Sequence, residues 1–410
     1  MNVTLEQIEF FLFVAAVVAM LARLIKIPYT VGLVIAGIAL AFVPYSNGIE
    51  LSKDLIFVIF LPTLVFEAAF YIRWPALKED FLVVVTLATV GVLLSAAVTA
   101  SAMHYLAGWQ WQIALVFGIL ITATDPVSVI ATFKETGVKG RLKLLVEAES
   151  LFNDSTTAVA FGVAITLAMG QGIDPASTLG VLGLSIGGGI LAGAAVAGGL
   201  LLLAGQTEDP LVEITLTTVA AYGSFFLAEY FDASGVLATL TAGLMIGNLG
   251  PLGAISTEGR KSVESFWEYA AFVANSLIFL LIGVRESHEN FGLLLVPIGV
   301  AIAAVLLGRA TAIYPLCALF TPSGLRVKAT HQHALFWGGL RGALSLALAL
   351  GLPLDLPHRS EVITVTFAVV AFSVFVQGLT MKPMLRAFGE IPPPHGVLES
   401  ASSSPQPKNG

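Results

Sequence analysis

The chain consists almost entirely of long apolar runs separated by short polar connections. Thirteen runs approach the roughly 20 residues that a membrane-spanning helix needs, although the second and the ninth are shorter than the others. The predicted spans lie near residues 8–24, 29–44, 55–71, 81–106, 111–133, 142–169, 177–204, 210–230, 234–249, 260–284, 290–320, 328–351 and 360–388. Strands of a membrane β-barrel would show short alternating segments instead. The pattern therefore predicts an all-α integral membrane protein with thirteen transmembrane helices within residues 1–390.

The distribution of basic residues among the connections tests this count. With the N-terminus outside, fifteen of the 20 Lys and Arg residues fall in inward-facing connections or the tail, three face outward and two lie inside spans. The inward group is Arg23, Lys26, Arg73, Lys78, Lys134, Lys139, Arg141, Lys143, Arg260, Lys261, Arg326, Lys328, Lys382, Arg386 and Lys408; the outward group is Lys53, Arg285 and Arg359; Arg309 and Arg341 lie inside spans. This bias follows the positive-inside rule and predicts a multi-pass protein of the cell (inner or plasma) membrane with a cytoplasmic C-terminus.

Composition supports the membrane interpretation and excludes other classes. The chain is 57% hydrophobic and 11% charged, with a mean hydropathy of +0.90, whereas soluble domains carry about 25% charged residues. No block of like charge resembles a nucleic-acid patch. Residues 391–410 are Pro- and Ser-rich and predict a short disordered cytoplasmic tail, without a regulatory domain.

Two predicted spans carry a helix breaker near the middle. In the fifth span the breaker is Thr124-Asp125-Pro126, because proline removes a backbone donor and clashes with the preceding turn. In the twelfth it is the segment Gly338-Gly339-Leu340-Arg341-Gly342. Thirteen spans suit two inverted six-span halves joined by one helix, and interrupted helices at matching positions point to a transporter's midplane site. The core bundle is then expected near residues 81–169 and 290–388, with scaffold helices from the remainder.

Four carboxylates, Asp125, Glu147, Glu149 and Asp154, lie in the fifth and sixth spans. A charged side chain at bilayer depth costs at least roughly 2.5 kcal/mol, so such residues need partners or a function. Glu147 and Asp154 share one helical stripe with Ser150. Ser150 and Asp154 can therefore present a hydroxyl and a carboxylate to one hard cation, since such ions prefer oxygen ligands.

Asp154 also suits proton chemistry. Desolvation raises a carboxyl pKa, whereas a neighbouring cation lowers it. One carboxylate can thus hold a proton or a metal ion but not both, and this competition is sufficient to couple two ions in antiport. The alternative is a structural carboxylate bonded to another helix. The amide of Asn153 is expected to brace the interrupted part of the fifth span.

Other polar residues within spans allow more than one interpretation. Arg341 needs a counter-ion, for which Glu149 is the first choice and Glu147 the second. Glu67 either reaches the site or extends to the cytoplasmic face beside Arg73. Arg309 is a buried charge without an assigned partner, and Glu213 and Glu229 are interpreted as carboxylates at the membrane interface. Asn275 and Ser276 are expected to make interhelical contacts, and His331 and His333 to lie at the solvated edge of a loop.

Taken together, three motifs resemble the NhaP/NHE-like branch of the monovalent cation:proton antiporters. They are Thr124-Asp125-Pro126, Glu149-Ser150-Leu151-Phe152-Asn153-Asp154 and Gly338-Gly339-Leu340-Arg341-Gly342, and the resemblance covers residues 8–390. It implies a homodimer of thirteen-span protomers, each with a dimerisation domain and a mobile six-helix core in which the fifth and twelfth spans cross. It implies exchange of Na⁺, or of Li⁺ or K⁺, for H⁺, with no cofactor.

The resemblance also implies roles for individual residues. Asp154 would be the principal ion and proton carboxylate, assisted by Asp125, Ser150, the Thr124 carbonyl and, through water, Glu67. Glu149 and Arg341 would form a structural ion pair. Related antiporters with an Asn-Asp pair exchange ions one for one, so Asn153-Asp154 implies electroneutral exchange.

Two other function classes fit the sequence less well. A cation channel would need a selectivity filter, and no TVGYG-type segment is present. An intramembrane aspartyl protease would need a YD…GxGD pattern, which is absent, and Asp125 is followed by proline. Gly183-Leu184-Ser185-Ile186-Gly187 matches a nucleophile elbow by letter but lies inside an apolar span, outside the strand-turn-helix context. A non-enzymatic antiporter is therefore predicted.

Overall fold

The computed structural model describes residues 5–25, 27–42, 53–170, 175–205, 207–250, 255–286 and 291–391, and within these ranges it contains helices and no strand. The first helices are α1 (Leu5–Ile25), α2 (Tyr29–Leu40), η2 (Leu55–Phe60), α3 (Leu61–Tyr71), α4 (Trp74–Tyr105), α5 (Trp111–Leu120), α6 (Val127–Thr136) and α7 (Arg141–Ala168). The remainder are α8 (Pro175–Ala204), α9 (Pro210–Tyr230), α10 (Gly235–Leu249), α11 (Thr257–Glu286), η4 (Phe291–Leu294), α12 (Leu295–Leu319), α13 (Ala329–Trp337), α14 (Ala343–Leu350), α15 (Arg359–Phe372), η5 (Ser373–Gly378) and α16 (Leu379–Ala387). The predicted tail falls almost wholly outside these ranges.

Within the described ranges, seven helices are long and apolar enough to cross a membrane. They span residues 74–105, 141–168, 179–204, 210–230, 257–285, 295–319 and 359–387. Shorter apolar helices cover 29–40, 55–71, 111–120 and 235–249. The chain is therefore an all-α, multi-pass membrane protein.

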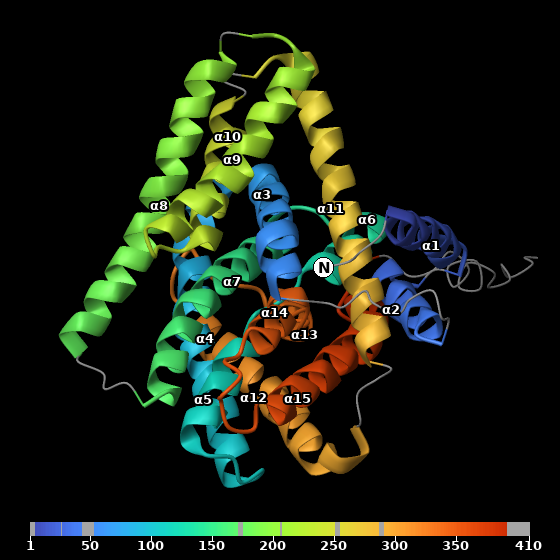
Figure 1. Cartoon of the computed structure of the whole chain (residues 1–410), viewed down its shortest axis with the longest axis vertical. Helices are drawn as coiled ribbons and strands as arrows, with labels where there is room; N and C mark the ends of the chain where they lie inside the picture. The colour runs from blue at the N-terminus through green and yellow to red at the C-terminus, as the bar shows by residue number, and fades with distance from the viewer. Residues whose placement is uncertain are drawn as a thin grey trace, which may run out of the picture.

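The helices pack as two bundles (Figure 1). In the crossed-helix bundle, which comprises α4–α7 and α12–α16 with η5, α4 packs against α5, α7 and α12. In the flanking bundle, which comprises α1–α3 and α8–α11 with η2, α10 packs against α3, α8 and α9, and α11 against α2. The two bundles meet where α7 contacts α3, α8 and α10, where α2 contacts α6 and η5, where α14 contacts η2, and where α15 contacts α11.

Two glutamates that we interpret from sequence as interfacial each accept a hydrogen bond near the start of a following helix. The buried Glu213 accepts a hydrogen bond from Ser256 N–H at 3.0 Å, just before α11. Glu229 accepts from Gly235 N–H at 3.2 Å, at the first residue of α10. Helix N-termini carry unpaired N–H groups and a partial positive charge, which a carboxylate satisfies. The interfacial interpretation is therefore wrong for Glu213, which is buried, whereas Glu229 is exposed and its interfacial position stays a prediction.

The two histidines are also not at a solvated loop edge. His331 is 7% exposed and its Nε2 lies 3.6 Å from a carboxylate oxygen of Glu390. His333 Nδ1 lies 2.9 Å from the Tyr314 hydroxyl, and its ring stacks on Phe388 at 4.7 Å between centroids. The end of the described chain thus packs against α13.

Candidate functional site

Two interrupted helices contact each other at the centre of the crossed-helix bundle. The first interruption separates α5 from α6 and includes Thr124, Asp125 and Pro126; the second separates α13 from α14 and extends from Gly338 to Gly342. The Asp125 N–H donates to the Leu340 carbonyl at 2.8 Å, which joins the two non-helical segments. The Ser345 hydroxyl adds a bond to the Ala123 carbonyl at 3.3 Å. Both interruptions lie where the sequence predicts them.

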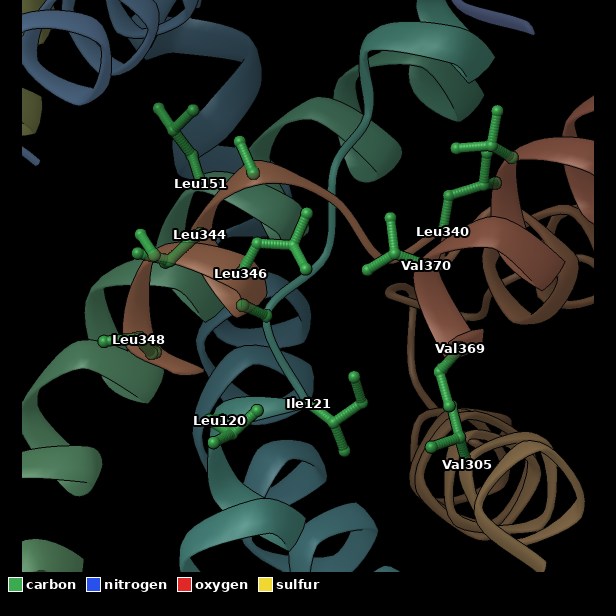
Figure 2. Packing of buried hydrophobic residues seen from close by; sticks show 14 of the residues in the cluster. Leu120, Ile121, Leu151, Val305, Leu340, Leu344, Leu346, Leu348, Val369 and Val370 are labelled. Atoms are coloured by element: carbon green, nitrogen blue, oxygen red, sulfur yellow. The ribbon is translucent and has the colours of Figure 1, made fainter. Parts of the chain in front are cut away.

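Buried apolar side chains hold the interruptions in place (Figure 2). They come from α5, α7, α12, α14 and α15 and from the interruptions themselves, and Figure 2 labels Leu120, Ile121, Leu151, Val305, Leu340, Leu344, Leu346, Leu348, Val369 and Val370. Interrupted helices leave unpaired backbone groups, with positive N-terminal ends at α6 and α14 and negative C-terminal ends at α5 and α13. This arrangement can offer both signs of partial charge to an ion.

The glycines of the second interruption allow close approach of charged side chains. A Cβ on Gly339 would lie 2.5 Å from Arg309 Nε, and one on Gly342 would lie 2.4 Å from Asp125 Oδ2. A Cβ on Gly338 would lie 3.0 Å from the Met381 Cε. The segment thus needs glycine because a side chain would displace the residues packed against it.

We expect Gly342→Ala to destabilise the protein, because the added methyl group overlaps the Asp125 side chain. Overpacking of this kind costs about 1–3 kcal/mol, so the midpoint of thermal unfolding of the purified protein should fall. Gly324→Ala is the matched control, since a Cβ there meets nothing within 4 Å. Equal midpoints for the two variants would contradict the close packing of Gly342 on Asp125.

Asp154, on α7, faces the first interruption. Its Oδ1 atom is buried and has no hydrogen-bond partner. The neighbouring Ser150 hydroxyl donates to the Thr124 carbonyl, and the Thr124 hydroxyl lies 3.0 Å from Ser150 Oγ. One oxygen of Asp125 accepts from Val127 N–H at 2.9 Å at the start of α6. Carboxylate, hydroxyl and carbonyl oxygens thus gather around one point of the crossing, the donor set that hard cations prefer.

Asn153 braces the interruption, as the sequence predicts. Its Nδ2 donates to the Thr122 carbonyl at 3.0 Å and lies 3.2 Å from Thr124 Oγ1. Its Oδ1 accepts from the Thr157 hydroxyl at 3.0 Å. Both the nitrogen and the oxygen of the Asn153 amide thus bond to other protein groups. We therefore assign Asn153 a supporting role in the site, because in this conformation neither atom is available as an ion ligand.

The predicted ion pair between Glu149 and Arg341 is wrong. Glu149 is held by Arg309 of α12, through Nη1–Oε1 and Nη2–Oε2 contacts of 2.6 and 2.8 Å, and both side chains are buried. Arg309 Nη2 also donates to the Leu335 carbonyl at 3.0 Å, so this pair ties α7, α12 and α13 together. The physical reason is geometric: α7 and α12 both pack on α4, which lets Glu149 and Arg309 form a bidentate carboxylate–guanidinium pair, whereas Arg341 points at the first interruption.

Arg341 is buried and hydrogen-bonds to backbone instead of a carboxylate. Its Nη1 donates to the Thr122 carbonyl at 2.9 Å and lies 3.5 Å from the Ala123 carbonyl. Its Nε is buried without a partner, and it forms no ion pair with any residue in the described ranges. Arg341 therefore helps to hold the C-terminal end of α5, where carbonyl groups are unpaired.

A cavity of about 600 Å³ lies between the two bundles and extends from the site to exposed residues at their boundary, such as Lys134 and Glu268. Asp125, Asp154 and Glu67 all line it, so Glu67 shares the cavity with the two aspartates. Glu147 lines it too and pairs with Lys143 at 3.3 Å. Asn275 lines the cavity from α11. The Ser276 hydroxyl is buried without a hydrogen-bond partner, so Ser276 forms no interhelical hydrogen bond.

Sequence reasoning missed two features of the bundle. Arg309 is left unassigned by sequence, although a lone guanidinium inside an apolar span signals the need for a buried carboxylate. The second is the buried Asp80, which pairs with Arg141 at 2.7 Å, while Arg141 also reaches the carbonyls of Leu325 and Arg326. Within the described ranges, no cluster of three or more His, Cys, Asp or Glu side chains could hold a resident metal ion.

Comparison with known proteins gives concordant matches along nearly the whole chain. The family model described as the transmembrane part of the sodium/hydrogen exchanger matches residues 11–387. The chain is 42% identical over 402 residues to the Na(+)/H(+) antiporter ApNhaP of Aphanothece halophytica, covering 94% of this chain and 76% of that protein. It is 33% identical over 405 residues to the Na(+)/H(+) antiporter NhaH of Halobacillus aidingensis, covering 93% and 97%.

A solved structure supports the fold independently. The sodium proton antiporter MjNhaP1 of Methanocaldococcus jannaschii, at pH 8, superposes with a TM-score of 0.74 at 20% identity, and the match covers 93% of this chain and 98% of that one. At this identity the likeness concerns the fold alone. The chain therefore has the all-α architecture of a membrane antiporter.

Proposed function

Because this chain belongs to the sodium/hydrogen exchanger family, it exchanges Na⁺ for H⁺ across a membrane, and we propose that the two ions compete for the carboxylate of Asp154. The observation that carries this proposal is the buried Oδ1 atom of Asp154, which lacks a hydrogen-bond partner and belongs to a residue that lines the cavity. A buried charge without a partner is costly, so this oxygen needs a proton or a cation. The channel and protease alternatives are not supported, because the matched relatives are named antiporters.

The surrounding oxygens supply the rest of the proposed cation site. The Thr124 carbonyl and the Ser150 hydroxyl bond to each other in this structure, and the incoming cation would take both as ligands together with the carboxylates of Asp154 and Asp125. Glu67 would act from the cavity wall, directly or through water. No resident cofactor enters this proposal, since Na⁺ and H⁺ are the cargo.

The finer architecture is part of the same proposal. Thirteen spans would comprise α1, α2, α3 with η2, α4, α5–α6, α7, α8, α9, α10, α11, α12, α13–α14 and α15–α16. The positive-inside distribution of charge supports this count, with the N-terminus outside and the C-terminus in the cytoplasm. Interruptions in α5–α6 and α13–α14 support two inverted halves.

We further propose that the crossed-helix bundle is the mobile core and that the flanking bundle supplies the dimer contacts. The sparse packing between the bundles supports the division. On α8, Leu179, Leu184 and Leu191 are more than half exposed, and a second copy or lipid would cover them. Chemical cross-linking of the purified protein in lipid tests the homodimer.

The proposed exchange can be measured directly. Purified protein in proteoliposomes with a preset pH gradient should dissipate that gradient on addition of Na⁺. Saturable dissipation supports the antiporter, whereas unitary currents in a planar bilayer would contradict it.

We expect exchange to be electroneutral, because Asp154 carries one charge that either a proton or a Na⁺ ion neutralises and its neighbour Asn153 is uncharged. An uncompensated charge crossing the membrane field would add about 2.3 kcal/mol per 100 mV. The measurement is the exchange rate with and without a membrane potential imposed by valinomycin and K⁺, after K⁺ itself has been tested as a substrate. A rate that changes several-fold with the potential would show that a second charge moves.

A further inference from the structure

The cavity that leads to Asp154 is bordered at its outer end by an ion pair between the two bundles. Lys134 lies on α6 and Glu268 on α11, and the Nζ–Oε1 distance is 3.4 Å. Both residues line the cavity, and their side chains are 61% and 58% exposed. The pair thus spans the mouth of the cavity, from the crossed-helix bundle to the flanking bundle.

Other ion pairs of the crossed-helix bundle remain inside it. Arg309–Glu149 joins α12 to α7, and Arg141–Asp80 joins α7 to α4. Next to Lys134 on the same helix, Glu135 pairs with Lys382 of α16 at 3.3 Å. The half-helix α6 is therefore held from one side by its own bundle and from the other by the flanking bundle.

If one carboxylate exchanges both ions, the two bundles must move relative to each other at the boundary that Lys134 and Glu268 bridge. Asp154 must be reached from each side of the membrane in turn, so the present cavity has to close while another opens. Lys134 and Glu268 lie on opposite walls, and α6 follows directly on the interruption that contains Asp125. A change in the separation of the walls must therefore alter the Lys134–Glu268 distance.

We propose that the Lys134–Glu268 ion pair is a latch across the mouth of the cavity that opens and re-forms in each exchange cycle. This inference rests on the proposed antiport function. A pair this exposed is weak, contributing at most about 1 kcal/mol, which is about a five-fold shift of a conformational equilibrium. It can bias the conformation without arresting it, unlike the buried Arg309–Glu149 pair, which stays closed.

The adjacent pair provides a matched control for a cross-linking test. In a Cys317→Ala background, which removes the single cysteine, Lys134→Cys with Glu268→Cys is compared with Glu135→Cys with Lys382→Cys. Both double variants are joined in proteoliposomes by a short thiol-cleavable linker. We expect the first link to abolish Na⁺-driven H⁺ exchange and thiol reduction to restore it, whereas the second link leaves exchange unchanged.

Charge variants test the electrostatic part of the latch. Lys134→Glu and Glu268→Lys each place like charges together and should change the exchange rate by up to about five-fold. The double variant, which re-forms the pair with reversed polarity, should recover the original rate. Full exchange in protein linked between positions 134 and 268, or no recovery in the reversed pair, would overturn the latch. Absence of exchange before linking in both cysteine variants and in the unmodified protein would instead overturn the antiport proposal.

Discussion

Asp154→Asn is expected to abolish Na⁺-driven H⁺ exchange in proteoliposomes. The substitution keeps the size of the side chain but removes the charge that attracts a monovalent cation and the group that binds and releases a proton. Because Asp154 Oδ1 has no hydrogen-bond partner, replacing the carboxylate breaks no interaction of that atom. The loss should therefore affect transport while the midpoint of thermal unfolding stays close to that of the unmodified protein.

Glu147→Gln is the matched control for this experiment. Glu147 lies on the same helix and lines the same cavity, but it is partly exposed and is paired with Lys143. Exposed pairs contribute little to stability, so this variant should retain exchange. Measurable exchange in Asp154→Asn, at any pH, would show that another carboxylate carries the ions.

The crossing at the centre of the fold could be predicted because its causes are local. Pro126 cannot continue a helix, and the glycines from Gly338 to Gly342 mark a segment where other chains approach closely. The face of α7 that carries Ser150 and Asp154 also follows from helical spacing alone. These signals are sufficient to place the candidate site before any packing is known.

The partners of the buried charges could not be predicted, because they depend on which helices become neighbours. Spacing along α7 shows on which face Glu149 lies, yet two arginines inside spans, Arg309 and Arg341, are equally plausible counter-ions. The choice is made by the packing of both α12 and α7 on α4 and by the direction of the non-helical segment that carries Arg341. Glu213 illustrates the same limit, since its role depends on where α11 begins.

The corrected ion pair leads to the second large effect. Arg309→Ala should lower the stability of the protein far more than Arg341→Ala. Removing Arg309 leaves the Glu149 carboxylate, which is 2% exposed, without its counter-ion, and breaking a buried pair in this way costs about 3–5 kcal/mol. Removing Arg341 deletes a charge that donates to backbone carbonyls and leaves no carboxylate unpaired. The measurement is thermal unfolding of the detergent-purified variants, followed by tryptophan fluorescence.

A double variant separates the unpaired charge from the loss of packing. In Glu149→Gln with Arg309→Gln, no charge is left without a partner, so the unfolding midpoint should recover much of the loss seen in Arg309→Ala. If Arg341→Ala were instead the more damaging change, or if the double variant unfolded as early as Arg309→Ala, the Glu149–Arg309 pair would not be what holds α7, α12 and α13 together. The expected order follows because an isolated buried charge costs more than the neutral groups that replace an intact pair.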